Sequence, residues 1–183
     1  MQPLIQNYNL EGQSKHIFNA STQAAQATTV ALATTYTGLC LSNPNNSQRN
    51  LYLLRVGVAL SVAPVAIASI GIMGTVSTTD VTHTTPGTVV STFLGSTSAT
   101  PAALNQGIPS VGLVDTSATL PVAPVWLEML MGGFTAGALP ASPVANFDFG
   151  GSWVIPPGGY IAIGSLTAVT GFFSMTWAAL PQQ

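Results

Sequence analysis

The chain has 183 residues, enough for one domain with a sizeable core. Hydrophobic residues make up 47% of it and charged residues 4%, whereas about a quarter of an ordinary domain is charged. The formal net charge is −2, and three basic side chains cannot neutralise a run of phosphates, so the composition argues against a nucleic-acid partner.

A surface with so little charge is covered instead by Ser, Thr, Asn, Gln and Ala. Isolated proteins near zero net charge tend to self-associate. We therefore expect much of this surface to be buried against copies of the chain or against a larger assembly. The alternative is a neutral, Thr-rich monomer.

The first 28 residues differ in composition from the rest. Residues 1–28 are rich in Gln, Asn, Ser and Ala and carry only scattered apolar residues. We interpret them as an extended N-terminal arm that lies outside the core and contacts another chain. Within the arm, residues 20–27 could form a short helix. Residues 29–183 are predicted to form a single domain.

From residue 29 onward the pattern is typical of β-strands. Residues 29–41 are Thr-rich with alternating apolar positions, and a turn cluster at 42–50 follows. Residues 51–62 alternate again, and residues 64–74 continue the pattern after a proline. One face of the strand at 51–62 is predicted to carry Leu54, Val56, Val58, Leu60 and Val62.

A long polar region follows these strands, and further predicted strands follow that region. Residues 74–119 are predicted to be mostly loop, with short strands near 87–95 and 110–115. Eighteen glycines and thirteen prolines punctuate the chain, and no long helical period competes with the strands. Eight to ten short strands between such corners favour a β-sandwich or barrel. The later predicted strands fall within residues 120–133, 145–155, 160–167 and 170–180. In the last of these, Phe173, Met175, Trp177 and Ala179 are predicted to share one face, and Phe172, Ser174, Thr176 and Ala178 the other.

A rigid corner is predicted between two of these strands. Pro156 and Pro157 end the first strand because neither can donate a hydrogen bond to a sheet. Gly158 and Gly159 can adopt a positive φ and reverse the chain. This corner has an architectural role and contains no reactive group.

The long uncharged stretches do not favour a membrane span. Residues 56–79 and 160–180 carry no charge, and a spanning helix needs about 20 apolar residues. Both stretches are interrupted by Gly, Ser and Thr, and neither has basic flanks that would set an orientation. We therefore expect no membrane partner.

Few residues could carry chemistry. Asp80 lies three residues before His83, His16 falls in the arm, and the single Cys40 is expected in a strand and cannot form an internal disulfide. A metal site needs three or four ligands within reach, so we assign no metal and no cofactor, and His83 is expected to make only a local hydrogen bond. Substituting His83 or Asp80 by alanine should then leave the melting temperature nearly unchanged.

Two arrangements stay open from the residues alone. Abundant serines leave a Ser–His–Asp grouping possible by count, although no nucleophile-elbow motif is present. Asp115 and Glu128 could meet in space as a carboxylate pair. Neither arrangement has a supporting motif, so we assign no catalytic residue and expect no enzyme.

Aromatic residues offer an alternative binding role. Trp126, Trp153, Trp177, Tyr52 and Tyr160 could line a sugar-binding face, although such residues more often lie in the core of a sandwich. If the face that carries Trp126 is core, the neighbouring Glu128 needs a partner, for which Arg55 is a candidate. Otherwise that face is exposed at a sheet edge.

Three segments resemble small virion structural proteins of tailed bacteriophages. They are Asn50–Val56 after the polar turn, Ser152–Ile163 with its Pro-Pro-Gly-Gly corner, and the closing residues 173–177 followed by Leu180-Pro181. Ala178 and Ala179 stand where we would expect acidic residues in such proteins. Many proteins of this family are jelly-roll decoration or cement proteins, so the resemblance implies a jelly-roll-like β-sandwich with a capsid-associated role.

We therefore expect an all-β, jelly-roll-like sandwich with an N-terminal arm that acts as a viral structural protein. It would bind the major capsid protein on the outside of a phage head and bridge capsomers, as a homotrimer on the capsid surface. The alternative is a receptor- or carbohydrate-binding jelly roll of a phage tail or spike. A hydrolase on the same fold is the third possibility.

Overall fold

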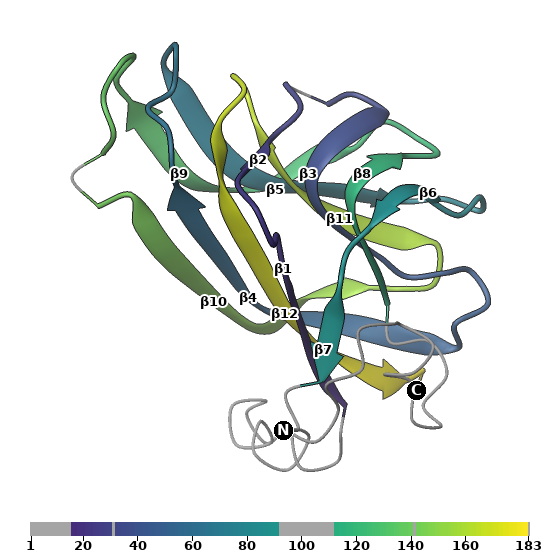
Figure 1. Cartoon of the computed structure of the whole chain (residues 1–183). Helices are drawn as coiled ribbons and strands as arrows, with labels where there is room; N and C mark the ends of the chain where they lie inside the picture. The colour runs from purple at the N-terminus through teal and green to yellow at the C-terminus, as the bar shows by residue number, and fades with distance from the viewer. Residues whose placement is uncertain (1–15, 31, 92–111, 141, 183) are drawn as a thin grey trace.

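The protein is an antiparallel β-sandwich of two sheets (Figure 1). The structure, a computed structural model, describes residues 16–30, 32–91, 112–140 and 142–182. Within these residues twelve strands occur, and no helical segment has the length and hydrophobicity that a transmembrane span needs. The predicted all-β class is therefore confirmed.

The first sheet has the strand order β10-β4-β12-β1-β7, and β2 pairs with the start of β12. Its central strands are β4 and β12, which pair along almost their whole length. The bounds are β1 (Ile17–Ser21), β2 (Gln26–Ala27), β4 (Arg49–Leu60), β7 (Val89–Ser91), β10 (Val144–Ile155) and β12 (Thr170–Pro181).

The second sheet has the order β6-β8-β3-β11-β5-β9. Strand β11 lies at its centre, and every residue of that strand is buried. The bounds are β3 (Thr35–Ser42), β5 (Ala68–Val76), β6 (Thr82–Pro86), β8 (Leu113–Thr119), β9 (Val125–Phe134) and β11 (Gly159–Ser165).

Eight of these strands have the connectivity of a jelly roll. In chain order they are β1, β3, β4, β5, β9, β10, β11 and β12, and the first pairs with the last, the second with the seventh, the third with the sixth and the fourth with the fifth. This nested pairing is that of a hairpin rolled up into two four-stranded sheets. The segment between β5 and β9 supplies β6, β7 and β8, which extend both sheets at one edge.

The core fills the space between the two sheets with aliphatic and aromatic side chains. Strand β12 shows the predicted alternation, since Phe173, Met175 and Trp177 are buried while Phe172 is 45% exposed. The rings of Trp177 and Phe18 pack with centroids 6.2 Å apart. The inward-facing residues of both sheets form one continuous cluster, as packing of two inner faces requires.

The predicted alternation along β4 is wrong for its first half. Leu51 and Leu53 are fully buried in the core, and so are Val56 and Val58 further along the same strand. A bulge opposite Thr176 and Trp177 of β12 inserts one residue between these two halves. The extra residue transfers the core-facing positions from odd to even numbers, and Leu54 is therefore buried on the outer face of the sheet.

The predicted N-terminal arm is wrong for residues 16–28. Strand β1 lies in the first sheet between β12 and β7, and Phe18 is fully buried in the core. Residues 20–27 form the end of β1, a bend and β2, not a helix. Deleting residues 1–28 would thus remove a core strand. Residues 1–15 lie outside the described part of the chain.

The polar region from 74 to 119 contains more strand than predicted. Strand β6 runs along the exposed edge of the second sheet and pairs with β8, although its residues are Thr, His and Pro. The predicted strands near 87–95 and 110–115 correspond to β7 and β8 in their described parts. Residues 92–95, 110 and 111 of those two predictions lie outside the described part, and residues 87, 88 and 112 are not in a strand.

The corner between β10 and β11 is confirmed as a tight turn. The Gly159 amide donates to the Pro156 carbonyl at 2.8 Å, which closes a four-residue turn. Gly158 has a φ of 77°, as the third residue of a type II turn requires, and Pro157 precedes it. This turn places the first residues of β11 at one end of the sandwich.

Candidate functional site

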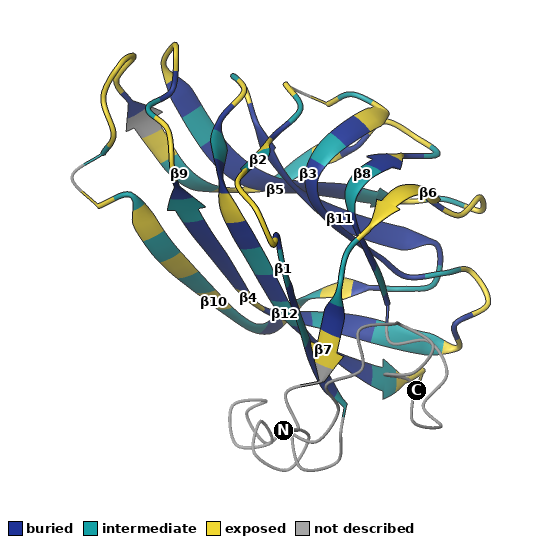
Figure 2. Ribbon diagram, in the orientation of Figure 1, coloured by how far each residue is buried: buried dark blue, intermediate teal, exposed yellow. Residues whose placement is uncertain are grey.

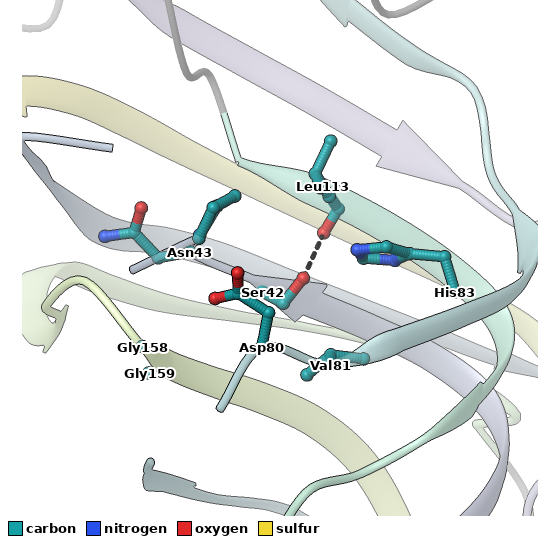
Figure 3. A pocket seen from close by; sticks show the side chains of 9 residues that line it. Ser42, Asn43, Asp80, Val81, His83, Leu113, Gly158 and Gly159 are labelled. Atoms are coloured by element: carbon teal, nitrogen blue, oxygen red, sulfur yellow. Dashed lines mark hydrogen bonds between the residues drawn. The ribbon is translucent and has the colours of Figure 1, made fainter. Parts of the chain in front are cut away.

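A polar pocket lies at the end of the sandwich where the β3–β4 and β5–β6 connections meet the β10–β11 turn (Figure 3). Its volume is about 260 Å³. The lining residues are Ser42, Asn43, Pro44, Asp80, Val81, His83, Leu113, Gly158 and Gly159.

The most distinctive contact at this pocket joins His83 of β6 to Asp115 of β8. The imidazole Nδ1 and one carboxylate oxygen are 2.5 Å apart, and the aspartate is fully buried while the histidine side chain is 30% exposed. The hydrogen bond to Asp115 raises the pKa of His83, partial burial opposes this, and the charges of Asp115 and Asp80 add to the rise. The pair therefore ties edge strand β6 to its neighbour β8 in the second sheet.

The sequence neighbours Asp80 and His83 do not bond to each other. Asp80 instead accepts hydrogen bonds from the backbone and side-chain amides of Asn45, both at 2.8 Å, and so holds the β3–β4 connection. Sequence spacing could not indicate Asp115 as the partner of His83, because strand pairing brings together positions 32 residues apart. The prediction that His83 makes only a local hydrogen bond is wrong.

The pocket does not assemble a serine nucleophile. The Ser42 hydroxyl donates to the Leu113 carbonyl at 3.3 Å (Figure 3), so its hydrogen bond runs to the backbone instead of to His83. An activated serine would need that bond to a base. Cys40 lies in β3 opposite Asp115, and burial followed by the charge of Asp115 raises the pKa of its thiol, which disfavours the reactive thiolate.

Metal ligands do not gather in the described residues. No group of three or more His, Cys, Asp and Glu side chains there could hold an ion. Asp115 and Glu128 lie in β8 and β9, with three strands of the second sheet between them. At about 4.8 Å per strand, this separation is far too great for a carboxylate pair.

Glu128 does not pair with Arg55, the partner that the sequence suggested. Glu128 lies exposed on edge strand β9 and accepts a hydrogen bond from the Trp153 indole at 3.0 Å. Arg55 lies in the other sheet, opposite Asp148 of β10. Glu128 is therefore exposed at a sheet edge, as in the alternative, whereas Trp126 on the same strand packs against a buried cluster.

The five aromatic residues considered for sugar binding do not share a surface. Trp177 is fully buried between the sheets, and Tyr160 is buried on the outer face of the second sheet, where its hydroxyl donates to the Val122 carbonyl at 2.5 Å. Trp153 packs against the main core, Trp126 against the outer cluster, and Tyr52 on the outer face of the first sheet. They act as packing residues.

The opposite end of the sandwich is apolar and carries no charge. Connections 28–34, 61–67, 135–143 and 166–169 contain no Asp, Glu, Lys, Arg or His. They meet at this end because the jelly-roll strands alternate in direction, and Figure 2 shows exposed residues along them. We call the following exposed residues at or beside these connections the apolar end: Val30, Leu32, Val62, Val65, Ile67, Leu139, Val144, Leu166 and Phe172.

Hydrogen bonds between the connections hold the apolar end together. The Gly137 amide donates to the Pro64 carbonyl at 2.8 Å, and the Thr167 hydroxyl donates to the Ile67 carbonyl at 3.1 Å. Thr28 and Val169 are joined in the same way through an amide–carbonyl bond of 2.9 Å. These bonds make one continuous surface of segments that are distant in the sequence, which is why no sequence motif indicated it.

Comparison with protein-family models, with curated proteins and with solved structures finds no match for this chain. The roles of the polar pocket and of the apolar end therefore follow from their own geometry. The polar pocket uses its carboxylates and amides to hold connections and strands in place, whereas the apolar end presents exposed apolar side chains.

The His83–Asp115 pair predicts a pH-dependent contribution to stability. The pKa of His83 is higher in the folded state than in the unfolded state, where it is about 6.5. The stability that the pair contributes is therefore fully present below about pH 6.5, and it is lost as the pH rises through the folded pKa. Substituting His83 by glutamine should therefore lower the melting temperature most at acid pH, by leaving Asp115 without its cation. Alanine at this position should cost about 1–3 kcal/mol, so the expectation from the sequence that His83→Ala leaves the melting temperature nearly unchanged is withdrawn.

Melting curves of the wild type and His83→Gln between about pH 5.5 and 9 would test this prediction. Thr84→Gln on the same exposed strand is the control, because Thr84 has no hydrogen bond to Asp115. A difference in melting temperature that grew as the pH rose would contradict the assigned direction of the shift.

Proposed function

We propose that the chain is a virion structural protein, a capsid decoration protein that binds the outside of a phage head and bridges its capsomers. The observation that carries the proposal is a jelly roll with almost no surface charge and with one end covered by exposed apolar residues. Jelly rolls recur in viral capsid proteins, and the segments around Asn50, Trp153 and Trp177 resemble phage structural proteins.

The physical basis of this function is burial of surface on assembly. Each Å² of apolar surface removed from water contributes about 25 cal/mol, without any requirement for charge. A net charge of −2 on 183 residues produces little repulsion between closely packed copies. A subunit that is repeated many times on a shell benefits from both properties.

The polar pocket supports a structural role over a chemical one. Its carboxylates contact Asn45 and His83, and its serine contacts a backbone carbonyl, so these groups maintain the fold at that end. The lack of a common aromatic surface gives no support to the alternative of a carbohydrate-binding tail protein.

Quantitative mass spectrometry of purified particles of the virus that encodes the chain tests the proposal. We expect the chain to remain on washed particles in a copy number comparable to that of the shell subunit. Mild denaturant should release it before the shell disassembles. Its absence from particles, or a copy number matching that of a tail component, would contradict a decoration role.

A further inference from the structure

We infer that the apolar end is the surface through which copies of this chain associate with one another. The inference deepens the proposed function and rests on it for the premise that the chain works as a repeated subunit. It identifies the contact surface and its occupant, a second copy of the same chain. Four observations support it: the exposure, the size, the neutrality and the preorganisation of this end.

The exposed side chains at this end are unusually apolar for a free surface. Val65 is 86% exposed and Ile67 is 73% exposed, both in the β4–β5 connection. Leu166 and Phe172 follow at 54% and 45% on the neighbouring chain segments. Scattered exposed hydrophobic residues are normal, but a contiguous group of this kind marks a site of association.

The connections that carry the apolar end are large enough to form one side of a stable interface. They contain about 25 described residues, most of them not buried, and a standard interface uses roughly 20–30 residues on each partner. A groove of about 320 Å³ adjoins it on the first sheet, between Val144 and Phe172. Its lining includes the small residues Gly57 and Ala59, which leave room for an apolar side chain from a neighbouring copy.

The neutrality of the apolar end favours an uncharged, apolar occupant, and a second copy of the chain has such a surface. A strongly charged partner would need complementary charges, and connections 28–34, 61–67, 135–143 and 166–169 contain none. An anionic lipid surface is attracted by clusters of basic residues, which are absent from the same connections. A second copy brings an equally neutral, apolar surface, so two copies meet without like-charge repulsion.

The hydrogen bonds between the connections reduce the cost of association. Besides the bonds already described, the Ser61 amide donates to the Thr170 carbonyl at 3.1 Å, and the Leu60 amide donates to the Pro143 carbonyl at 2.8 Å. Segments that are already tied to each other lose less conformational freedom when a partner binds. Closed symmetry is the usual outcome for such homo-oligomers, in keeping with the homotrimer proposed from the sequence.

Sedimentation velocity on the full chain tests the inference with a double variant, Val65→Asp with Ile67→Asp. Both side chains are exposed, so the fold should tolerate the change, and an unchanged melting temperature would verify this. Burial of two carboxylates in the interface should raise the dissociation constant by about 100-fold or more. Val76→Asp is the matched control, because Val76 is a 57% exposed valine near the opposite end.

We expect the wild type and Val76→Asp to form the same oligomer at micromolar concentration and the folded double variant to be monomeric. A monomeric wild type, or an oligomer that persists in the folded double variant, would overturn the inference. A wild type that is monomeric alone but binds phosphatidylcholine vesicles would overturn it in favour of a lipid surface. If the oligomer depends on the apolar end but the chain is absent from particles, the proposed function fails and the inference stands.

Discussion

Substituting Trp177 by alanine is expected to lower the free energy of unfolding by about 3–5 kcal/mol. Trp177 is fully buried between the sheets, and its ring packs against that of Phe18. It lies in β12, which pairs with both β4 and β1, so the cavity would open at the centre of the first sheet. This loss is a large fraction of the stability of an ordinary domain.

Chemical denaturation of Trp177→Ala beside Trp153→Ala would test this expectation. Trp153 is only partly buried and bonds to the exposed Glu128, so its replacement should cost clearly less than that of Trp177. Equal losses in the two variants would show that the core is not centred on Trp177.

Substituting Gly158 by valine is the second change expected to have a large effect. The φ of Gly158 is 77°, a region in which a β-branched residue is strained by about 1–3 kcal/mol. A Cβ atom there would also collide with the carbonyl oxygen of Ser77 and approach the Asn45 side-chain oxygen to 2.5 Å. The amide of Ser77 donates to the Gly158 carbonyl at 2.9 Å, so relieving the clash would disturb the β5–β6 connection as well.

A matched control separates the strain from the collision. Gly150 also has a positive φ, 57°, but a Cβ at this position meets no atom within 4 Å. Gly150→Val should therefore show only the conformational cost, and Gly158→Val should lower the melting temperature further. If the two variants melted at the same temperature, close packing around the β10–β11 turn would not contribute to stability.

The sequence predicted best those features that depend on local chemistry. The turn at Pro156–Gly159 follows from residues that restrict or free the backbone, and it was placed correctly. The alternation in β12 follows from the two-residue period of a strand, and it identified Phe173, Met175 and Trp177 as one face, which the structure buries.

Features that depend on tertiary context could not be predicted in the same way. Strand β1 was interpreted as part of an arm because residues 1–28 are rich in Gln, Asn, Ser and Ala, yet its place between β12 and β7 buries Phe18. The bulge in β4 was missed because a strand and a bulged strand have the same composition, and only pairing with β12 reveals the extra residue.

The candidate sites depend on tertiary context even more than the strands do. His83 and Asp115 belong to different strands, and the pairing of β6 with β8 brings them together. The apolar end combines four connections that are spread over the chain, each unremarkable in its own sequence. The scarcity of charge was visible from composition and indicated association, but only the jelly-roll topology places the uncharged connections at one end.

Under the proposed function the chain is encoded by a virus, and electron cryomicroscopy of intact particles of that virus would test this proposal. If the proposal is right, repeated density on the outer surface of the shell will fit the two-sheet sandwich. In that density, the connections that carry Val65, Ile67 and Leu166 should meet those of neighbouring copies around a symmetry axis. Density found only at the tail, or copies on the shell whose apolar ends face solvent, would contradict it.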